Sequence, residues 1–477
     1  MPPPRLWDAF CSGDATATAW LGGFDLAPAA IAQRPTAAID RAGLVAALDS
    51  QPGNDPALTR RLRDPGSVAV VCGQQPAVGG GPLYSLIKAA QAVALAERIS
   101  ATGRVCVPVY WCASEDHDLD EADHADLIAR NGDLHRHAAD LGGGRASLRF
   151  RPALRWWDGF QDRLTAIAGP GLGSADWAAL KPAPEEGMGA WTCRVLTHLL
   201  PGLVAVEGHR LRPLWRDQAR RVLRHWPATA LADLARDLEK HGFAPAFADL
   251  SRPPVFADRP DGRVEVSPDA ALRLLDDEPG AFSPGAALRP ILQQAALPAV
   301  AFIAGPGEVA YHAQLGPVYA AAEVPRPQIV PRISVTVLPT WIARAAERWG
   351  LDPSQPDQTP PARPTPLATE LAALDEALST LAAAPLTGDA ARRRATGLAR
   401  LTREAVRLRA SLARDERRQA ELLPPGAVRA WLRPRSTGQD RVLSLAQAVV
   451  LAGPGLAGLL VEAARSTAAS GSSIIRL

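Results

Sequence analysis

The sequence contains few cysteines, and they follow no recognisable pattern. Its 477 residues include only five, and no two of them are spaced as CxxC: Cys11, Cys72, Cys106, Cys112 and Cys193. An odd number of cysteines without close pairs argues against a disulfide framework and against a structural zinc site. The sequence therefore predicts a protein of a reducing compartment, and we expect it in the cytoplasm.

The chain also lacks an excess of charge and a long apolar run. Its 52 basic and 50 acidic residues give a net charge of +2, so it has no basic field of the kind that nucleic-acid-binding proteins carry. The most apolar stretch, 443–461, is broken by Gln447 and by Gly453, Pro454 and Gly455. Because a membrane span needs about 20 apolar residues, we predict two packed helices there and no membrane span. The first residues show no signal-peptide pattern.

The composition itself is that of a globular protein. Apolar residues make up 47% and charged residues 21% of the chain, which allows a large core and excludes a largely disordered protein. At about 150 residues per domain, the length predicts about three domains.

Two segments read as β-α-β units of an α/β fold. In the first, Val68–Cys72 is a short apolar run typical of a strand buried on both faces. A glycine-rich loop follows over 73–84, then apolar residues at helical spacing over 83–99, and a second strand over 105–111. Pro108 inside that strand predicts a bulge or an edge position.

The second unit runs from 298 to 334. It has a strand at Ala299–Ala304, a loop at Gly305–Glu308, a helix at Val309–Ala322 and a strand at Gln328–Val330. The two units could form the halves of one parallel sheet. Ligands of open α/β sheets bind beyond the carboxyl ends of the strands, so we expect the loops after these strands to form the site.

The C-terminal third predicts helices. Six prolines within 351–366 indicate a stiff linker, and leucines at 4-3-4-3 spacing from Leu367, resumed from Leu398 to Leu412, predict an antiparallel coiled-coil hairpin. The ten arginines between Ala390 and Ala420 form a solvated face, a dimer contact or a phosphate-binding face. The predicted divisions are 1–124 (N-terminal segment and first half of the core), 125–285 (insertion), 286–350 (second half of the core), 351–366 (linker), 367–424 (hairpin) and 425–477 (α-rich segment packing on the core).

The glycine-rich loop is the first candidate for binding. Glycines such as Gly73, Gly80 and Gly81 let backbone N–H groups approach a phosphate, and the following helix adds its partial positive charge. Gln74 and Gln75 suit hydroxyl, carbonyl or carboxylate groups. The sequence has no GxxxxGK[ST] motif, and a plain tight turn is the alternative interpretation.

The second candidate is the cluster of titratable residues after the second strand. Glu115, Asp116, His117 and Asp118 are followed by Asp120, Glu121, Asp123 and His124. The cluster could bind a metal, hold an amine or act as general acid and base, and His117 has the most suitable pKa for proton transfer near neutrality. The spacing would put several members on one helical face. The alternative is an acidic helix start.

A third group lies in the second unit. Glu308 follows a strand, where a carboxylate can pair with an ammonium group, and Tyr311 and Gln314 lie one turn further on. Arg332, Ser334 and Thr336 follow the last strand of the unit and could hold phosphate oxygens. Their alternatives are a helix N-terminal acid and ordinary surface loop residues.

Several strings together resemble a known family. They are VCGQQPAVGGGPLYSLIKA, VPVYWCASEDHDLDEADH, RPILQQ with LPAVAFIAGPGEVAYHAQLGPVY, PRISVT and, near the C-terminus, GQDRVLSL. These strings and the helical hairpin are similar to the bacillithiol-biosynthesis cysteine-adding enzymes, the BshC family of cysteine ligases. The resemblance runs from about Val68 to the C-terminus and is weakest across the insertion. The chain departs from the family pattern at Val78, His312 and Asp440.

The resemblance implies a fold and a reaction. It implies a Rossmann-type core similar to class I aminoacyl-tRNA synthetases, connecting-peptide insertions, and a coiled coil that forms a homodimer. The implied reaction joins cysteine through an amide to the amino group of glucosaminyl malate, with ATP or another nucleotide as co-substrate. Residues 80–84 stand where a HIGH motif would lie, and residues 332–336 where a KMSKS-like loop would lie.

These observations define a hypothesis for the site. Asp116, His117 and Asp118 would serve the attacking amine, and no metal is expected. Nucleotide phosphates would lie at Gly73, Gly80, Gly81, Arg332, Ser334 and Thr336. Substrates would contact Gln74, Gln75, Tyr84, Lys88, Ser114, Glu115, Glu308, Tyr311 and Gln314. Two alternatives stay open: a metal-dependent hydrolase or transferase using the cluster from Glu115 to His124, and a coiled-coil scaffold without a strand-end pocket.

Overall fold

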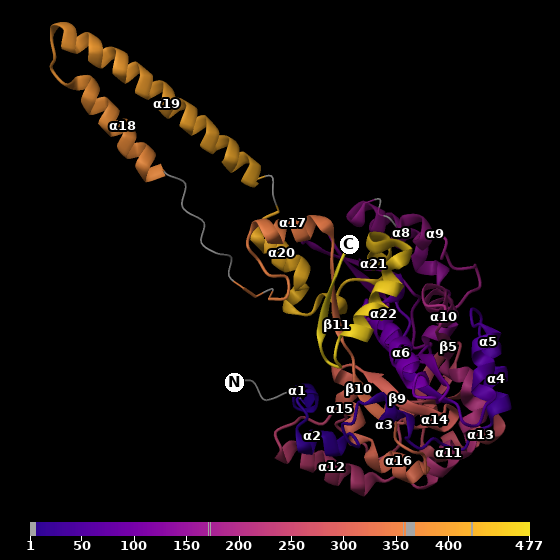
Figure 1. Cartoon of the computed structure of the whole chain (residues 1–477). Helices are drawn as coiled ribbons and strands as arrows, with labels where there is room; N and C mark the ends of the chain where they lie inside the picture. Colours follow the sequence, from indigo (N-terminus) through magenta and orange to yellow (C-terminus); the bar gives the residue numbers. More distant parts are fainter. Residues whose placement is uncertain (1–5, 170, 172, 356, 359–367, 421–422) are drawn as a thin grey trace.

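A five-stranded parallel sheet forms the centre of the protein (Figure 1). The computed structural model describes residues 6–169, 171, 173–355, 357–358, 368–420 and 423–477. The spatial order of the strands is β10-β9-β1-β2-β5, and every pair is parallel. Their bounds are β1 Val68–Gln74, β2 Cys106–Cys112, β5 Val204–Glu207, β9 Ala299–Ala304 and β10 Gln328–Pro331. The predicted α/β class is confirmed, and the two units are halves of one sheet.

The sheet is buried on both faces, which explains its continuous apolar strands. In β1 alternate side chains enter two different cores: Val68 and Val70 belong to one, Ala69 and Val71 to the other. Successive side chains of a strand point to opposite faces, so an all-apolar strand needs cover on both sides. The first face is covered by α6 (Tyr84–Ser100) and α22 (Leu456–Ser466), the second by α4 (Arg41–Asp49), α11 (Arg212–Arg224), α14 (Arg289–Ala296) and α16 (Gly316–Ala322).

Three expectations about strands and helices need correction. β5 lies inside 125–285, so this stretch is not wholly an insertion; its strand has only four residues and leaves little signal. Of the two alternatives predicted for Pro108, the bulge is absent, since β1 and β2 pair in continuous register, and the edge position holds on the other side of β2. β5 pairs only with Val109–Cys112, so Pro108 lies where that side of β2 has no strand partner. The expected helix 309–322 is two helices, broken before Gly316 and Pro317: α15 (Pro306–Gln314) and α16.

The remaining elements of the first 350 residues surround the sheet. The N-terminal helices are α1 (Leu6–Cys11), α2 (Ala15–Trp20), α3 (Pro28–Ala32) and α5 (Pro56–Thr59). Between β2 and β9 lie α7 (Leu119–Ala122), β3 (His124–Ile128), β4 (Leu134–Ala138), α8 (Leu154–Ala168), α9 (Ser174–Ala178), α10 (Met188–Leu199), α12 (Ala228–Lys240), β6 (Val255–Arg259), β7 (Gly262–Glu265), α13 (Pro268–Asp277) and β8 (Phe282–Pro284). The tryptophans of α8–α10 pack together through stacked and edge contacts.

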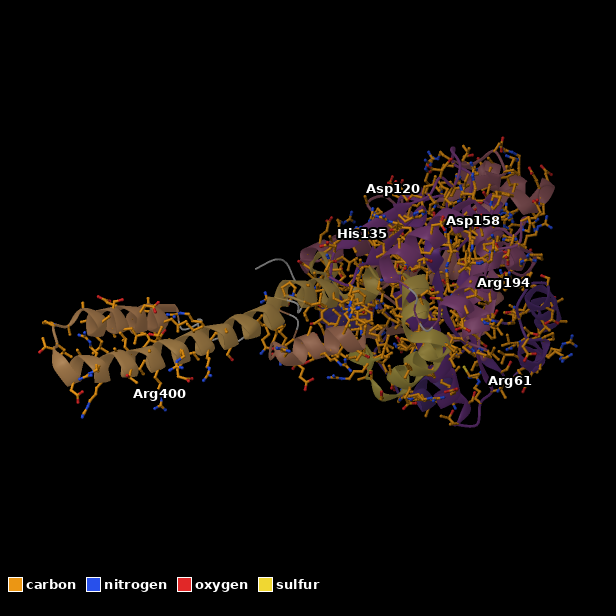
Figure 2. All side chains as sticks on the ribbon, turned by 90° about the horizontal axis from the view of Figure 1, so that it is seen from above. Arg61, Asp120, His135, Asp158, Arg194 and Arg400 are labelled. Atoms are coloured by element: carbon orange, nitrogen blue, oxygen red, sulfur yellow. The ribbon has the colours of Figure 1, made fainter. Side chains whose placement is uncertain are left out.

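The C-terminal part returns to the core after a helical hairpin. α18 (Ala368–Ala383) and α19 (Gly388–Ala420) project from the body, and Arg400 lies on the outer side of α19 (Figures 1 and 2). Around them lie α17 (Thr340–Arg348), α20 (Pro425–Leu432) and α21 (Leu445–Ala452). Most of the proline-rich linker, and Leu367, lie outside the described residues. A coiled-coil seam stays a prediction.

The apolar stretch near the C-terminus folds as expected, into α21 and α22 with a turn at Gly453–Gly455. The helical stretch Leu445–Ser466 is long and apolar enough to span a membrane by length and composition, but 67% of its most apolar window is buried inside the protein. The segment ends in β12 (Ser472–Arg476), which pairs with β11 (Ser334–Leu338) in a separate two-stranded sheet. Ser334 and Thr336 therefore lie in a strand and not in a loop.

The glycine-rich loop is hydrogen-bonded to the C-terminal segment. Gly79, Gly80 and Gly81 all have positive φ, between 65° and 79°, a conformation that glycine adopts without steric cost. The Leu83 N–H donates to the carbonyl of Leu443, and the Leu445 N–H donates to the carbonyl of Gly81, both at 2.8 Å. The loop is buried, and its glycines allow its backbone to come close to the backbone of the C-terminal segment.

We expect Gly79→Ala to destabilise the protein more than Gly81→Ala. Both positions have positive φ, so alanine is strained at either, by about 1 kcal/mol or more. A Cβ at Gly79 would also lie 2.7 Å from Cζ of Phe160, whereas the nearest atom to a Cβ at Gly81 is 3.6 Å away. Urea denaturation followed by tryptophan fluorescence measures both. Equal midpoints in the two variants would contradict the packing argument.

Candidate active site at the strand ends

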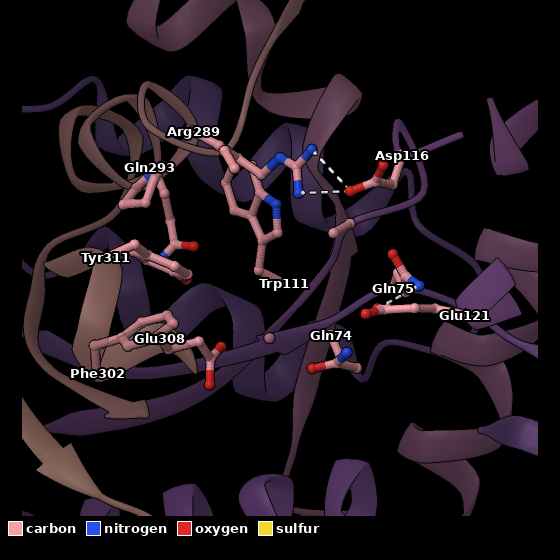
Figure 3. A pocket seen from close by; sticks show the side chains of 14 residues that line it. Gln74, Gln75, Trp111, Asp116, Glu121, Arg289, Gln293, Phe302, Glu308 and Tyr311 are labelled. Atoms are coloured by element: carbon pink, nitrogen blue, oxygen red, sulfur yellow. Dashed lines mark hydrogen bonds and ion pairs between the residues drawn. The ribbon is translucent and has the colours of Figure 1, made fainter. Parts of the chain in front are cut away.

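A cavity of about 340 Å³ opens at the carboxyl ends of three sheet strands (Figure 3). Gln74 comes from β1, Asp116 from the loop after β2, and Phe302 and Glu308 from β9 and the helix after it. The loops after the strands thus meet at one edge, as the topology predicts.

A second cavity of about 460 Å³ adjoins the first. Both are lined by Gln74, Glu121, Glu308 and Tyr311. The second adds the N-terminal turn of α15 and a set of cationic and aromatic side chains: Tyr84, Lys88, Arg332 and Arg441. A pocket at the strand ends is what the scaffold alternative excludes, so the structure argues against that alternative.

Lys88 and Glu308 form an ion pair on the shared wall. Nζ of Lys88 lies 2.5 Å from Oε2 of Glu308, with the two side chains 2% and 16% exposed. Lys88 also donates to the carbonyl of Gly73 at 3.0 Å, and Oε2 accepts the N–H of Gly305 at 2.6 Å. Oε1 of Glu308 has no partner among the described residues and can receive a ligand cation.

Arg332 is held against Tyr84 by the C-terminal segment. Its NH1 lies 2.5 Å from Oδ2 of the buried Asp440, and its guanidinium lies 5.2 Å from the centroid of the Tyr84 ring. Burial raises the pKa of Tyr84 to about 12, and the nearby carboxylates of Glu121 and Glu308 add to the shift. Asp440 is thus the acidic partner of Arg332.

The acidic cluster after β2 does not lie on one helical face. α7 is a single turn, Oδ1 of Asp118 accepts the N–H of Asp120 at 3.1 Å, and His124 already belongs to β3. The acidic-helix-start interpretation is therefore correct for Asp118 and Asp120. The described residues bring together no group of three or more His, Cys, Asp or Glu side chains that could hold a metal.

Ser114 and Glu115 face away from the cavities, which corrects their predicted substrate role. The Ser114 hydroxyl donates to Oε1 of Glu207 at 2.9 Å, and Glu115 pairs with Arg212 in the interior. Burial raises the pKa of Glu115, but the charges of Arg212, His209 and Arg149 outweigh it and leave the pKa below its usual value. Both residues join β2 to the elements around β5.

Acidification should expose the contribution of Glu115 to stability. Because its folded pKa is lowered, that contribution is complete above the unfolded value of about 4.3 and is lost as the pH falls through the folded pKa. We expect Glu115→Gln to unfold at lower urea concentration than the wild type at pH 7, and the difference to shrink below about pH 4. Urea midpoints measured from pH 7 to pH 3 check this. A constant difference would mean that the pair does not titrate as described.

Together with Glu121, Asp116 is a member of the cluster that lines the first cavity. Its Oδ2 lies 3.4 Å from both NH1 and NH2 of Arg289, and its Oδ1 accepts the N–H of His117 at 2.9 Å. Burial raises the pKa of Asp116, whereas Arg289, Arg263 and the His117 N–H lower it, so that it lies below its usual value. Asp116 is therefore ionised near neutral pH.

His117 lies between two arginines and lines neither cavity. Its Nδ1 is 2.9 Å from NH1 of Arg263, and its Nε2 is 3.2 Å from NH2 of Arg145. Burial and the charge of Arg263 lower the pKa of His117. The ring is thus neutral near pH 7, so it can accept a hydrogen bond from only one of the two arginines.

Other predicted residues divide between the cavities and the interior. Gln75 donates to Oε2 of Glu121 at 3.0 Å inside the first cavity. Gln314 instead holds the backbone of Phe247, accepting its N–H at 2.9 Å. Gly80 and Gly81 are buried, and Ser334 and Thr336 line a separate cavity of about 870 Å³. The predicted phosphate site is therefore divided: Arg332 lies by the second cavity without Gly80, Gly81, Ser334 or Thr336.

The structure adds residues that the motifs did not single out. Trp111, Arg289 and Gln293 line the first cavity, and Arg441 lines the second. A signal existed for two of them, because Arg289 and Gln293 stand in the string RPILQQ, one helical turn apart. Trp111 lies at the end of the predicted second strand, where the sequence places the site but does not mark this side chain. Arg441 reaches the site only through the packing of a distant segment.

Parallel strands, a helical crossover and two joined strand-end cavities define a Rossmann-like α/β protein with room for two ligands. Residues 33–160 and 256–333 match the model of the family "Bacillithiol biosynthesis BshC, N-terminal Rossmann-like domain". Over these residues the chain is similar to the N-terminal Rossmann-like domain of the BshC family, and the resemblance drawn from the motifs is confirmed.

Curated relatives give the same result. The chain is 31% identical over 321 residues to a protein of Koribacter versatilis (61% of this chain, 58% of the relative). It is 31% identical over 349 residues to one of Solibacter usitatus (67% and 65%) and 32% identical over 330 residues to one of Salinibacter ruber (61% and 58%). Each is named "Putative cysteine ligase BshC". The chain spans about three fifths of the length of the relatives that it matches.

Proposed function

We propose that the protein is a cysteine ligase of bacillithiol biosynthesis that joins cysteine to the amino group of glucosaminyl malate. The observation that carries the proposal is the pair of adjoining cavities with a shared wall of Gln74, Glu121, Glu308 and Tyr311. A ligase must bring two substrates together at one reacting bond, and two chambers with a common wall meet that need. The names of the relatives support the reaction class.

The second cavity is suited to an activated donor. Lys88, Arg332 and Arg441 place positive charge there, and the N-terminal turn of α15, which includes Gly307, adds backbone N–H groups. Together these favour phosphate oxygens, so we assign a nucleotide co-substrate, ATP or a relative of it, to this chamber. Activation of the cysteine carboxyl as an acyl phosphate or adenylate makes its carbonyl reactive. Oε1 of Glu308 would receive the cysteine ammonium.

The first cavity is suited to the acceptor amine. Asp116 presents an ionised carboxylate there, and a positioned carboxylate can take the proton that the attacking amine must lose. His117 lines neither cavity and Asp118 caps α7, so we assign the proton to Asp116. Glu121, whose pKa is raised by burial and by Asp118 and Asp116, faces the same space and holds substrate polar groups.

Product analysis tests the proposal. Purified protein receives cysteine, glucosaminyl malate and ATP, with an ATP-free control, and mass spectrometry follows the products. We expect the cysteinyl amide only with ATP, together with AMP or ADP, which identifies the activation chemistry. Folded protein that forms no amide under either condition contradicts the proposed reaction.

We further propose that the hairpin forms a homodimer in the cytoplasm. Among the described residues, five of the seven large apolar side chains that are strongly exposed lie on it: Leu381, Leu386, Leu401, Val406 and Leu408. Leu401 and Leu408 are seven residues apart and share one helical face, which a second copy could cover. Light scattering is expected to give a dimer for the wild type and a monomer for Leu401→Glu with Leu408→Glu. A monomeric wild type would contradict this.

A further inference from the structure

One wall of the first cavity carries polar side chains from α14, one of which has a buried nitrogen without a partner. Gln293 on this helix is 6% exposed and lines the cavity. Nε of Arg289, one turn earlier on the same helix, is buried without a hydrogen-bond partner among the described residues. Because buried polar groups are ordinarily satisfied, this wall indicates a polar ligand.

The contact between Arg289 and Asp116 is loose. Both terminal nitrogens of Arg289 lie 3.4 Å from the same carboxylate oxygen, beyond the usual 2.7–3.2 Å of an N–H···O bond. Arg289 therefore has bonding capacity left for a second carboxylate. In Figure 3 its guanidinium turns toward Asp116, while Gln293 and Tyr311 lie across the cavity from Gln75 and Glu121.

We propose that Arg289 and Gln293 form a carboxylate subsite for the acceptor, and that a bound carboxylate draws Arg289 away from Asp116. The inference rests on the proposed ligase function and deepens it, because it assigns the residues that would select the acceptor by its carboxylate. A ligand carboxylate can bind the Arg289 guanidinium through two parallel hydrogen bonds, one to each carboxylate oxygen. Asp116 offers only one oxygen, Oδ2, to both nitrogens of Arg289. The Gln293 amide donates to the same carboxylate or to a neighbouring hydroxyl.

Binding of the amino sugar then frees Asp116 from Arg289, so that Asp116 can accept a proton from the amine. The acceptor ammonium gives one proton to Oδ2 of Asp116, and the nitrogen lone pair forms the amide bond to the carbonyl carbon of activated cysteine. The bond from that carbon to the phosphate oxygen breaks, and the second nitrogen proton goes to the leaving phosphate. An acceptor without a carboxylate leaves Asp116 paired with Arg289 and so reacts slowly.

The charges around Asp116 agree with this order of events. Arg289 and Arg263 face it as cations, His117 donates its backbone N–H, and Glu121 lies on the same side of the cavity. Arg289 is the largest of the influences that lower the pKa of Asp116. When the Arg289 guanidinium moves toward a ligand carboxylate, the pKa of Asp116 rises. Asp116 then becomes a better base.

Calorimetric binding of malate alone tests the subsite without any turnover. We expect Arg289→Met to weaken malate binding about 10- to 100-fold and Gln293→Leu to weaken it about fivefold. Arg155→Met is the matched control, because Arg155 is an exposed arginine paired with Asp140 and lines neither cavity. Unchanged malate affinity in Arg289→Met and Gln293→Leu, or wild-type protein that does not bind malate, overturns the subsite.

Acceptor kinetics test the link to Asp116. Wild-type protein should prefer glucosaminyl malate to methyl glucosaminide in kcat/KM, and Arg289→Met should lose that preference. With methyl glucosaminide, which has no carboxylate, the acidic limb of the pH–rate profile should lie at higher pH in Arg289→Met than in the wild type, because the variant lacks the cation that lowers the pKa of Asp116. An unchanged preference overturns the link.

The two proposals can fail separately. If the wild type forms no amide from any acceptor but binds malate through Arg289, the ligase function fails and the carboxylate subsite stands. If amide forms and malate binding is independent of Arg289, the subsite fails and the ligase function stands. Arg289→Lys keeps the charge but not the paired geometry, and its intermediate malate affinity is the expected result should Arg289→Met not fold.

Discussion

Lys88→Met is expected to destabilise the protein by about 3 kcal/mol, the lower end of what the loss of one partner of a buried ion pair costs. Lys88 is 2% exposed and pairs with Glu308, which keeps 16% exposure and is therefore partly hydrated. The substitution leaves the carboxylate without its cation and also removes the donor to the carbonyl of Gly73. Urea denaturation followed by tryptophan fluorescence measures the change.

An exposed ion pair provides the control. Lys181 lies 2.9 Å from Asp158, with the side chains 52% and 74% exposed, and such pairs contribute about 0–1 kcal/mol. Lys181→Met should therefore leave the midpoint nearly unchanged. Glu308→Gln in the Lys88→Met background should recover part of the loss, because the uncompensated charge is gone. If Lys88→Met and Lys181→Met lowered the urea midpoint equally, the ion pair between Lys88 and Glu308 would have to be as solvated as the exposed pair.

The sequence predicts those parts of the sheet whose strands are long and continuously apolar. β9 has the predicted bounds, and β1 only extends further, to Gln74, because both need cover on two faces and so consist of apolar residues throughout. β5 has four residues and ends in Glu207, so its pattern does not differ from that of a buried turn. β11 pairs with β12, more than 130 residues away, and no local signal predicts such a partner.

At the site, too, the sequence predicts the segment but not the direction of each side chain. Ser114, Glu115 and Asp116 are consecutive, yet only Asp116 enters the cavity, since the loop after β2 turns the other two toward Glu207 and Arg212. Motif reasoning finds the loop but not which side chain faces the ligand. Arg289 and Arg441 reach the site from distant segments, so their places depend on the fold as a whole.

Under the proposed ligase function, we expect Asp116→Asn to nearly abolish amide formation but to leave the activation of cysteine intact. Asparagine has the same shape and can still accept the N–H of His117, but it cannot take a proton; loss of such a base lowers the rate about 10²- to 10⁴-fold. Hydroxylamine attacks an activated acyl group without help from a base, so cysteine hydroxamate should form at nearly the wild-type rate.

Two neighbouring substitutions decide whether Asp116 acts alone. Asp118→Asn keeps the oxygen that caps α7, and His117→Ala removes a ring that lines neither cavity, so both should retain most of the amide-forming rate. A loss in His117→Ala as large as that in Asp116→Asn would show that the imidazole takes part in the proton transfer. Loss of hydroxamate in Asp116→Asn would instead place Asp116 in the activation step. Because the three residues are consecutive on one loop, the comparison separates their roles in the chemistry from a shared effect on folding.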